Sequence, residues 1–384
     1  MTAPSKKTRS KMMGPGDQKI EYRRVGNSGL KVSVPILGTM GFGNKLWQPW
    51  CVDEEASLKV LKAAYDLGIN TWDTANTYSN GESERIIGKA IKEFKIPRDK
   101  LVIMTKCYCA VGDEPGMQSY MMPELKFRKD YVNRLGLSRK AIFSEVNASL
   151  ERLGLEYIDL LQIHRCDPET TPEETMEALH DLVKSGKCVV SFPLLPASPK
   201  SLMLGNRIRY IGASSMWTWQ FCLYQQAAER NNWTKFISMQ NQYSLIYREE
   251  ERDMIPYCRA TGVGIIPWAP LARGHLTRLS AAEIDSERSN MEKKYQGEAF
   301  FAVGSSEVDK STISRIKEVA DRKGWTMAEV ALAWILGKDT APIVGISKVE
   351  RVADTAGLKG KSLSENEVEF LEELYIPRKI SGHI

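Results

Sequence analysis

Short runs of consecutive apolar residues alternate with longer amphipathic stretches along most of the chain. Each run is apolar throughout, which is typical of strands that are covered on both faces in a parallel sheet. Eight of these runs are predicted to be strands, and they are Pro35–Gly38, Asn70–Asp73, Leu101–Lys106, Ile158–His164, Ile208–Ser214, Ile237–Gln240, Gly264–Trp268 and Pro342–Ile346.

The stretches between the runs carry the signals that begin and end helices. Thr171–Glu174 combines an N-cap threonine, a proline at the first helical position and a capping-box glutamate. Ser364–Glu367 repeats the capping box near the C-terminus. Asp53 can cap a helix that Gly68 then ends. Strands and helices that alternate in this way predict an α/β fold, a (β/α)8 TIM barrel with an extra C-terminal helix.

A β-hairpin is predicted ahead of the barrel. The turn Val25–Leu30 separates two short β-like runs, and the resulting hairpin could plug the N-terminal end of the barrel. Residues 1–18 are polar and basic, and we expect them to form a disordered tail. The remaining residues, 19–384, are expected to form a single domain.

Composition and charge narrow the classes of function. The chain has 384 residues, of which 42% are hydrophobic and 26% charged, and its formal net charge is +5. The charges are interspersed along the predicted helices, whereas a nucleic-acid-binding protein usually carries a basic stripe. No apolar run reaches the roughly 18–20 residues that cross a bilayer, and the basic N-terminus lacks the apolar core of a secretory signal. Nucleic-acid binding, membrane insertion and secretion are therefore not expected.

The chain contains seven cysteines, an odd number scattered along its length. This distribution favours free thiols in a reducing compartment over a disulfide framework. Cys107 and Cys109 lie close together, but no second pair completes a zinc site, so no metal is expected. We expect a cytoplasmic protein that is a monomer or a weak homo-oligomer.

The segment Cys188–Arg207 interrupts the pattern of strands and helices. The helix that ends near Lys187 should reach the strand Ile208–Ser214 within about 2–6 residues. The segment instead holds three prolines, no acidic residue and no helical period. One interpretation is a genuine insertion. The other is a translated intron in an incorrect gene structure, because removing the segment joins Lys187 directly to Ile208.

Four polar side chains lie at the ends of successive predicted strands, where α/β barrels place their active sites. Asp73 ends the second strand, and Tyr78 follows it. Lys106 ends the third strand and His164 ends the fourth. A phenol titrates near pH 10, so the Lys106 ammonium is expected to lower the pKa of Tyr78, while Asp73 holds the lysine. His164 can orient a carbonyl oxygen, so the set suits protonation of an oxygen while a hydride reaches the adjacent carbon.

The sequence resembles the aldo-keto reductase superfamily from Tyr22 to Tyr375. The resemblance is carried by G-T-M at 38–40, N-T-W-D-T-A-N-T-Y at 70–78, I-G-A-S-S at 211–215 and P-W-A-P-L-A-R-G at 267–274. It implies that Asp73, Tyr78, Lys106 and His164 form a catalytic tetrad. Within this family, the sequence most resembles fungal members of the versiconal hemiacetal acetate and norsolorinic acid reductase type.

The resemblance also implies NADPH/NADP+ as the cofactor. No Gly-x-Gly-x-x-Gly fingerprint opens a strand–helix turn, so a Rossmann site is not indicated. The last strand instead runs into a helix start with serine, lysine and arginine, which would suit the adenosine 2′-phosphate. Trp268 stands where many members have a stacking tyrosine. The implied cofactor-binding residues are Gly38, Thr39, Met40, Asp73, Ser214, Ser215, Gln240, Trp268, Ala269, Pro270, Leu271, Gly274, Gly345, Ser347, Lys348 and Arg351.

Aromatic residues near the strand ends are candidates to line the substrate pocket. An aromatic wall suits a flat or bulky carbonyl compound better than a small sugar. The candidates are Trp47, Trp50, Tyr108 and Trp217.

The predicted activity is the NADPH-dependent reduction of an aldehyde or ketone to an alcohol, with Tyr78 as the proton donor. Three alternatives remain open at this point. They are an NADPH-binding regulatory subunit with slow turnover, an aryl-alcohol dehydrogenase that works in the oxidative direction, and a Schiff-base lyase that uses Lys106.

Overall fold

The strands form one parallel eight-stranded sheet that closes on itself. The computed structural model describes residues 20–185, 207–279, 304 and 306–383. Strand order in the sheet is β10-β3-β4-β5-β6-β7-β8-β9. Backbone hydrogen bonds from Ala341 N to Ile265 O (3.0 Å) and from Ile343 N to Pro267 O (2.8 Å) join the two outer strands and close the barrel. The strands are β3 Ile36–Gly38, β4 Thr71–Asp73, β5 Val102–Cys107, β6 Ile158–Ile163, β7 Ile208–Ser214, β8 Ser238–Gln240, β9 Gly264–Ile265 and β10 Ile343–Gly345.

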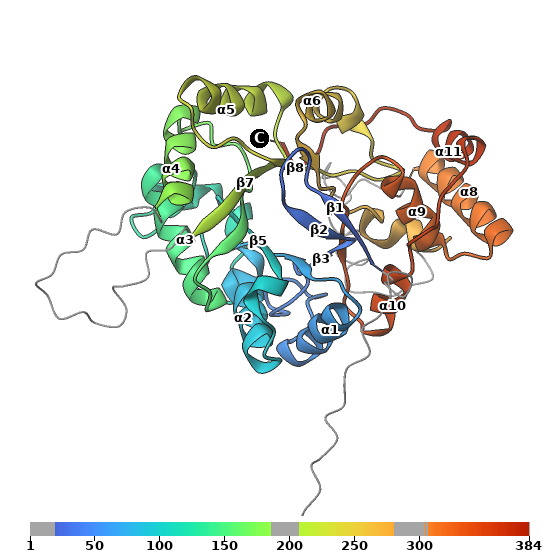
Figure 1. Ribbon diagram of the computed structural model, residues 1–384, viewed down its shortest axis with the longest axis horizontal. Coiled ribbons are helices and arrows are strands. Elements are labelled where there is room, and N and C mark those ends of the chain that lie inside the picture. The colour runs from blue at the N-terminus through green and yellow to red at the C-terminus, as the bar shows by residue number, and fades with distance from the viewer. Residues whose placement is uncertain (1–19, 186–206, 280–303, 305, 384) are drawn as a thin grey trace, which may run out of the picture.

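Helices surround the barrel and cover the outer faces of its strands (Figure 1). Three of the predicted caps are present: Asp53 accepts from Ala56 N, Thr171 accepts from Glu174 N, and Ser364 makes a full capping box. The expected extra C-terminal helix is α11. The helices are α1 Glu54–Asp66, α2 Glu82–Glu93, α3 Arg139–Leu153, α4 Pro172–Lys184, α5 Thr218–Arg230, α6 Met254–Thr261, α8 Glu307–Lys323, α9 Met327–Leu336, α10 Glu350–Ala356 and α11 Glu365–Glu372.

The predicted hairpin is formed by β1 (Glu21–Arg24) and β2 (Lys31–Val34), which pair antiparallel. Figure 1 shows it lying across the centre of the barrel. Its contacts are with residues that precede barrel strands, because Tyr22 Oη donates to Gly68 O at 2.7 Å and Asn27 N donates to Gly262 O at 2.8 Å. The hairpin therefore covers the N-terminal end of the barrel, which confirms the expected plug.

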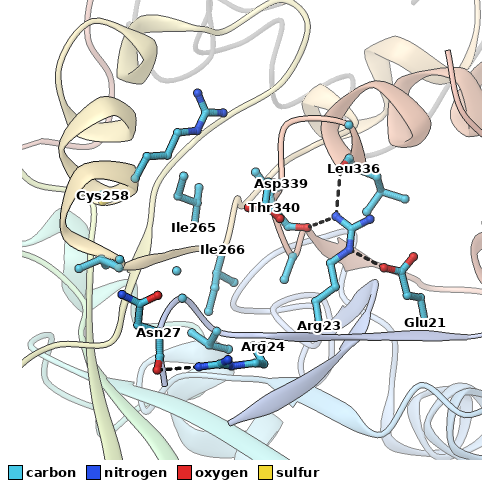
Figure 2. Close-up of a pocket in the computed structure, with 18 residues that line it drawn as sticks. Glu21, Arg23, Arg24, Asn27, Cys258, Ile265, Ile266, Leu336, Asp339 and Thr340 are labelled. Atoms are coloured by element: carbon cyan, nitrogen blue, oxygen red, sulfur yellow. Dashed lines mark hydrogen bonds and ion pairs between the residues drawn. The ribbon is translucent and has the colours of Figure 1, made fainter. Parts of the chain in front are cut away.

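A polar cavity of about 800 Å³ lies between the hairpin, α6 and the segment that leads into β10. Figure 2 shows that Arg23 reaches across it to the backbone carbonyls of Leu336 and Thr340, at 2.9 Å and 3.2 Å. Arg24 donates to Asn27 O at 2.9 Å, within the turn of the hairpin itself. Arg23 therefore holds the hairpin on the barrel, at the end opposite the one where barrel active sites form.

Most predicted strands are longer than the observed ones by one or two residues at an end. The largest difference is in β9, which ends at Ile265 although the apolar run continues to Trp268. Pro267 lacks a backbone N–H, and Ala269 has a positive φ of 51°, so the chain leaves the ladder here. Lys106 is followed by one more strand residue, Cys107.

The described residues contain no helix that is long and apolar enough to cross a membrane. Six cysteines within them are free thiols, as the scattered pattern predicts. The expected tail at residues 1–18 lies outside the described residues, and so does the segment Cys188–Arg207 except for its last residue.

Candidate active site

The four predicted catalytic residues meet at the C-terminal end of the barrel strands. Asp73 is the last residue of β4, Lys106 is the last but one of β5, and His164 directly follows β6. Lys106 Nζ lies 2.6 Å from Asp73 Oδ2 and 3.3 Å from the Tyr78 hydroxyl oxygen. The rings of Tyr78 and His164 meet edge to face, with their centroids 5.8 Å apart.

The Lys106 ammonium is fully buried and its three protons have three acceptors. Besides Asp73 and Tyr78, Nζ donates to Thr74 O at 2.8 Å. An ammonium has no lone pair and can only donate, so the Tyr78 oxygen accepts from the lysine. The phenolic proton of Tyr78 is therefore directed elsewhere and can be given to a substrate.

Two buried amides orient the carboxylate of Asp73. Gln162 Nε2 and Gln240 Nε2 each donate to Asp73 Oδ1 at 3.1 Å, and Gln240 Nε2 also donates to Gln162 Oε1 at 2.9 Å. Gln240, which the resemblance implies for the nicotinamide carboxamide, thus also belongs to the network around Asp73. Sequence reasoning missed Gln162, whose signal is a single amide inside the apolar run Ile158–Ile163.

Burial and charge act in opposite directions on the catalytic pair. Burial raises the pKa of Tyr78, and although the Lys106 charge opposes this, the pKa stays above its usual value. Burial lowers the pKa of Lys106, but Asp73 and Tyr78 together bring it above its usual value. The expectation of a lowered pKa for Tyr78 is thus wrong for this structure, because burial outweighs the ammonium. At neutral pH the phenol keeps its proton and the lysine keeps its charge.

His164 is held neutral. Burial, together with the charges of Arg165 and Lys106, places the pKa of His164 well below its usual value. Its Nδ1 is buried and has no hydrogen-bond partner among the described residues, while its backbone N donates to Cys107 O at 2.9 Å. A neutral imidazole keeps one N–H, which can donate to a carbonyl oxygen.

Ser214, Ser215 and Trp268 lie next to this network. Ser214 Oγ donates to Gln240 O at 2.7 Å, and Trp268 Nε1 donates to Ser215 Oγ at 3.0 Å. Ser215 has a φ of 37°, and Ser79, which follows the catalytic tyrosine, has a φ of 48°. Non-glycine residues with positive φ store strain and cluster at functional sites.

The comparisons with known proteins agree with this geometry. The sequence pattern of the aldo/keto reductase family matches residues 36–189 and 205–376. The chain belongs to the aldo/keto reductase family. An aldo-keto reductase of Fusarium vanettenii is 50% identical over 370 residues, which cover 95% of this chain and 94% of that protein. The versiconal hemiacetal acetate reductase of Aspergillus parasiticus is 47% identical over 364 residues, which cover 94% and 98%.

Membership of the aldo/keto reductases makes the chain an oxidoreductase of carbonyl compounds, and members of this family typically use NADH or NADPH. The residues implied for the pyrophosphate lie in the loop after β9, which is held in an unusual conformation. Ala269 has a φ of 51°, Ala272 of 44° and Gly274 of 99°, and Gly274 N donates to Leu271 O at 2.8 Å. The adjacent Pro270 is buried.

The residues implied for the adenosine phosphate have the exposure and the positive charge that an anion requires. Gly345, Ser347, Lys348 and Arg351 are all exposed, at and beyond the end of β10. Neither basic side chain forms an ion pair within the described part of the chain, so both are available to a phosphate.

Two residues of the motif at 38–40, which the resemblance implies for the cofactor, pack against neighbouring strands. Thr39 is fully buried, and its Oγ1 donates to Asp73 O at 3.0 Å. A Cβ at Gly38 would lie 2.7 Å from Ile343 Cγ2, so only glycine fits between β3 and β10. Met40 is half-exposed. The first two residues of the motif therefore position β4 and its aspartate, and Met40 alone reaches the surface.

One of the four predicted substrate residues contacts the tetrad. The Trp47 ring lies 6.4 Å from that of Tyr78. Trp217 is 37% exposed, and no contact with the tetrad is observed for it in the described residues. Trp50 and Tyr108 are half-buried in the loops after β3 and β5.

Sequence reasoning missed two further features of this rim. Arg165 follows the catalytic histidine, and its signal was a charged residue directly after a strand end. The C-terminal segment Ser381–His383 had no sequence signal, because its contacts are distant in the chain. Ser381 N donates to Tyr247 Oη at 2.9 Å, and the His383 ring lies 4.9 Å from that of Trp217.

Proposed function

We propose that this aldo/keto reductase uses NADPH to reduce an aldehyde or ketone to an alcohol. The observation that carries the proposal is the bridge that Lys106 Nζ makes between Asp73 Oδ2 and the Tyr78 hydroxyl, at 2.6 Å and 3.3 Å. Such a bridge leaves Tyr78 protonated and fixes the direction in which its proton can leave.

The roles of the side chains follow from their charges. Bound NADPH would supply a hydride to the carbonyl carbon. The neutral His164 donates a hydrogen bond to the carbonyl oxygen and orients it. Tyr78 then gives its proton to that oxygen as negative charge develops there, and the Lys106 ammonium stabilises the phenolate that remains. Asp73, held by its two amides, keeps the ammonium in place.

The preference for NADPH over NADH is supported by the exposed Ser347, Lys348 and Arg351. The 2′-phosphate of NADPH would pair with the cations Lys348 and Arg351, and NADH has no such phosphate. The nicotinamide end would lie against Ser214, Ser215 and the Trp268 indole, which can stack on a flat ring.

A flat or bulky carbonyl substrate is supported by the tryptophans at the rim and by the relatives. One of these is named as a versiconal hemiacetal acetate reductase. An aromatic wall suits a flat or bulky carbonyl compound. We therefore infer a substrate from fungal polyketide-type secondary metabolism.

A screen of NADPH oxidation tests the proposal. Purified protein is mixed with NADPH or NADH and with aromatic aldehydes and polyketide-like ketones, and the alcohol product is identified by mass spectrometry. We expect alcohol formation with a clear preference for NADPH, and a Lys348→Met/Arg351→Met variant that loses this preference. Binding of NADPH without alcohol formation from any compound would instead support a regulatory subunit.

A further inference from the structure

An arginine stands at the mouth of the site, directly after the catalytic histidine. Arg165 is half-buried, and its Nη1 donates to His164 O at 2.6 Å. A Cβ built on Gly382 would lie 3.7 Å from Arg165 Nη2. The same Cβ would lie 3.5 Å from Trp268 Cζ2 and 3.8 Å from Ser215 Cβ. The guanidinium thus lies near Trp268 and Ser215, which are proposed to hold the nicotinamide, and contacts the backbone of the catalytic histidine.

Within the described residues, nothing balances the charge of Arg165. In the ranges that the structure describes, no carboxylate forms an ion pair with it. Burial lowers the pKa of Arg165, and the groups that favour its charge are Cys109, Tyr78 and Tyr108. Burial raises the pKa of all three, to about 11 for Cys109, so they are neutral at pH 7. A guanidinium remains protonated in proteins, so it faces neutral neighbours.

The acids nearest to the mouth have other partners. Asp73 is held within the tetrad. Asp167, two residues beyond the arginine, accepts from Thr170 Oγ1 at 2.7 Å, and Glu250 Oε1 lies 3.1 Å from His383 Nε2. A half-buried cation without a counter-ion is costly, so the site is built to receive negative charge from outside the protein.

We propose that Arg165 binds an anionic group, a carboxylate by preference, on the same compound whose carbonyl oxygen is held by Tyr78 and His164. The inference rests on the proposed carbonyl reduction and adds a substrate class to it: aldehydes and ketones that carry an acidic group. The planar guanidinium matches a carboxylate in bidentate geometry. Arg165 is adjacent to His164 in the chain, which limits how far the guanidinium lies from the bound carbonyl oxygen. The distance between the acidic group and the carbonyl group of a substrate should therefore affect how well it is reduced.

Matched pairs of substrates test the inference. The 2-, 3- and 4-carboxybenzaldehydes are compared with the corresponding formylbenzamides, which have the same shape and no charge. We expect at least one isomer for which kcat/KM for the acid exceeds that for the amide by about tenfold or more, the scale of a charged hydrogen bond.

Three variants locate the source of this preference. In Arg165→Met, the acid-to-amide ratio should fall to about one, and in Arg165→Lys it should be intermediate. The matched control is Arg134→Met, which removes a cation from the loop after β5. Arg134 Nη1 already pairs with Asp113 Oδ1 at 3.1 Å, so its loss should leave the ratio unchanged.

Three results would overturn the inference. They are a wild-type ratio near one for every isomer, an Arg165→Met variant that slows acid and amide equally, and one that weakens NADPH binding with the ratio intact. Calorimetric titration with terephthalate and isophthalate separates this inference from the proposed function. If no aldehyde is reduced, dicarboxylate binding that Arg165→Met abolishes still supports the anion site, and absence of binding contradicts it.

Discussion

Lys106 and Asp73 form a fully buried ion pair, and each stabilises the charge of the other. Removing one partner of such a pair leaves an uncompensated charge and costs about 3–5 kcal/mol. We therefore predict that Lys106→Met lowers the free energy of unfolding by several kcal/mol, measured by urea denaturation. The double variant Asp73→Asn/Lys106→Met, which removes both charges, should recover part of the loss. Equal stability of the single variant and wild type would contradict the assigned pairing.

His164 links stability to pH through its lowered pKa. Above pH of about 6.5 the histidine is neutral in both the folded and the unfolded state, so it contributes no pH dependence. As the pH falls below this value, the unfolded state gains a proton that the folded state excludes, and stability is lost.

We predict that wild type loses more stability than His164→Gln between pH 7.5 and 5. The measurement is the free energy of unfolding by urea at each pH, followed by tryptophan fluorescence. Parallel pH profiles for the two proteins would mean that His164 is solvated and free to protonate.

At the scale of elements, the connection between α4 and β7 departs most from the barrel pattern. Helix-to-strand connections lie at the N-terminal end of the strands, opposite the catalytic rim. The family match also stops at residue 189 and resumes at residue 205, so the unmatched residues fall within Cys188–Arg207. A genuine insertion and a translated intron would both leave such a gap. We propose that the segment is a translated intron, and sequencing of the transcript distinguishes the two.

We predict that a protein without residues 188–207 folds and keeps kcat/KM within roughly twofold of the full chain, because the catalytic rim is remote. Less of it should elute as aggregate in size-exclusion chromatography. An insoluble or inactive deletion variant would show instead that the segment is a genuine part of the barrel.

In the whole molecule, the apolar runs predicted the barrel because a strand that is apolar throughout is buried on both faces. This holds regardless of which strands are its neighbours in the sheet. The tetrad could be predicted for a related reason, since the ends of parallel strands meet at one rim. The contacts that orient the tetrad residues could not be predicted from the sequence. Gln240 reaches Asp73 across 167 positions of sequence, and no local pattern announces this.

The sign of the pKa shift of Tyr78 was missed for the same physical reason. The neighbouring Lys106 is visible in the strand pattern, but the extent to which the barrel buries both groups is not. The lack of an ion pair at Arg165 within the described residues is equally a property of the whole rim, because it depends on where Asp167 and Glu250 point.

In the proposed reaction, the Tyr78 hydroxyl donates the proton to the substrate oxygen. Tyr78→Phe removes this oxygen and little else. Tyr120→Phe is the matched control, because the Tyr120 ring lies 5.9 Å from that of Trp47, whose ring lies 6.4 Å from that of Tyr78. The decisive measurement is single-turnover NADPH oxidation at saturating substrate, with the Kd for NADPH measured alongside by fluorescence. We predict a rate at least ~10²-fold lower for Tyr78→Phe, with NADPH binding retained and the control near wild type. A Tyr78→Phe enzyme that binds NADPH and turns over at the wild-type rate would contradict the account.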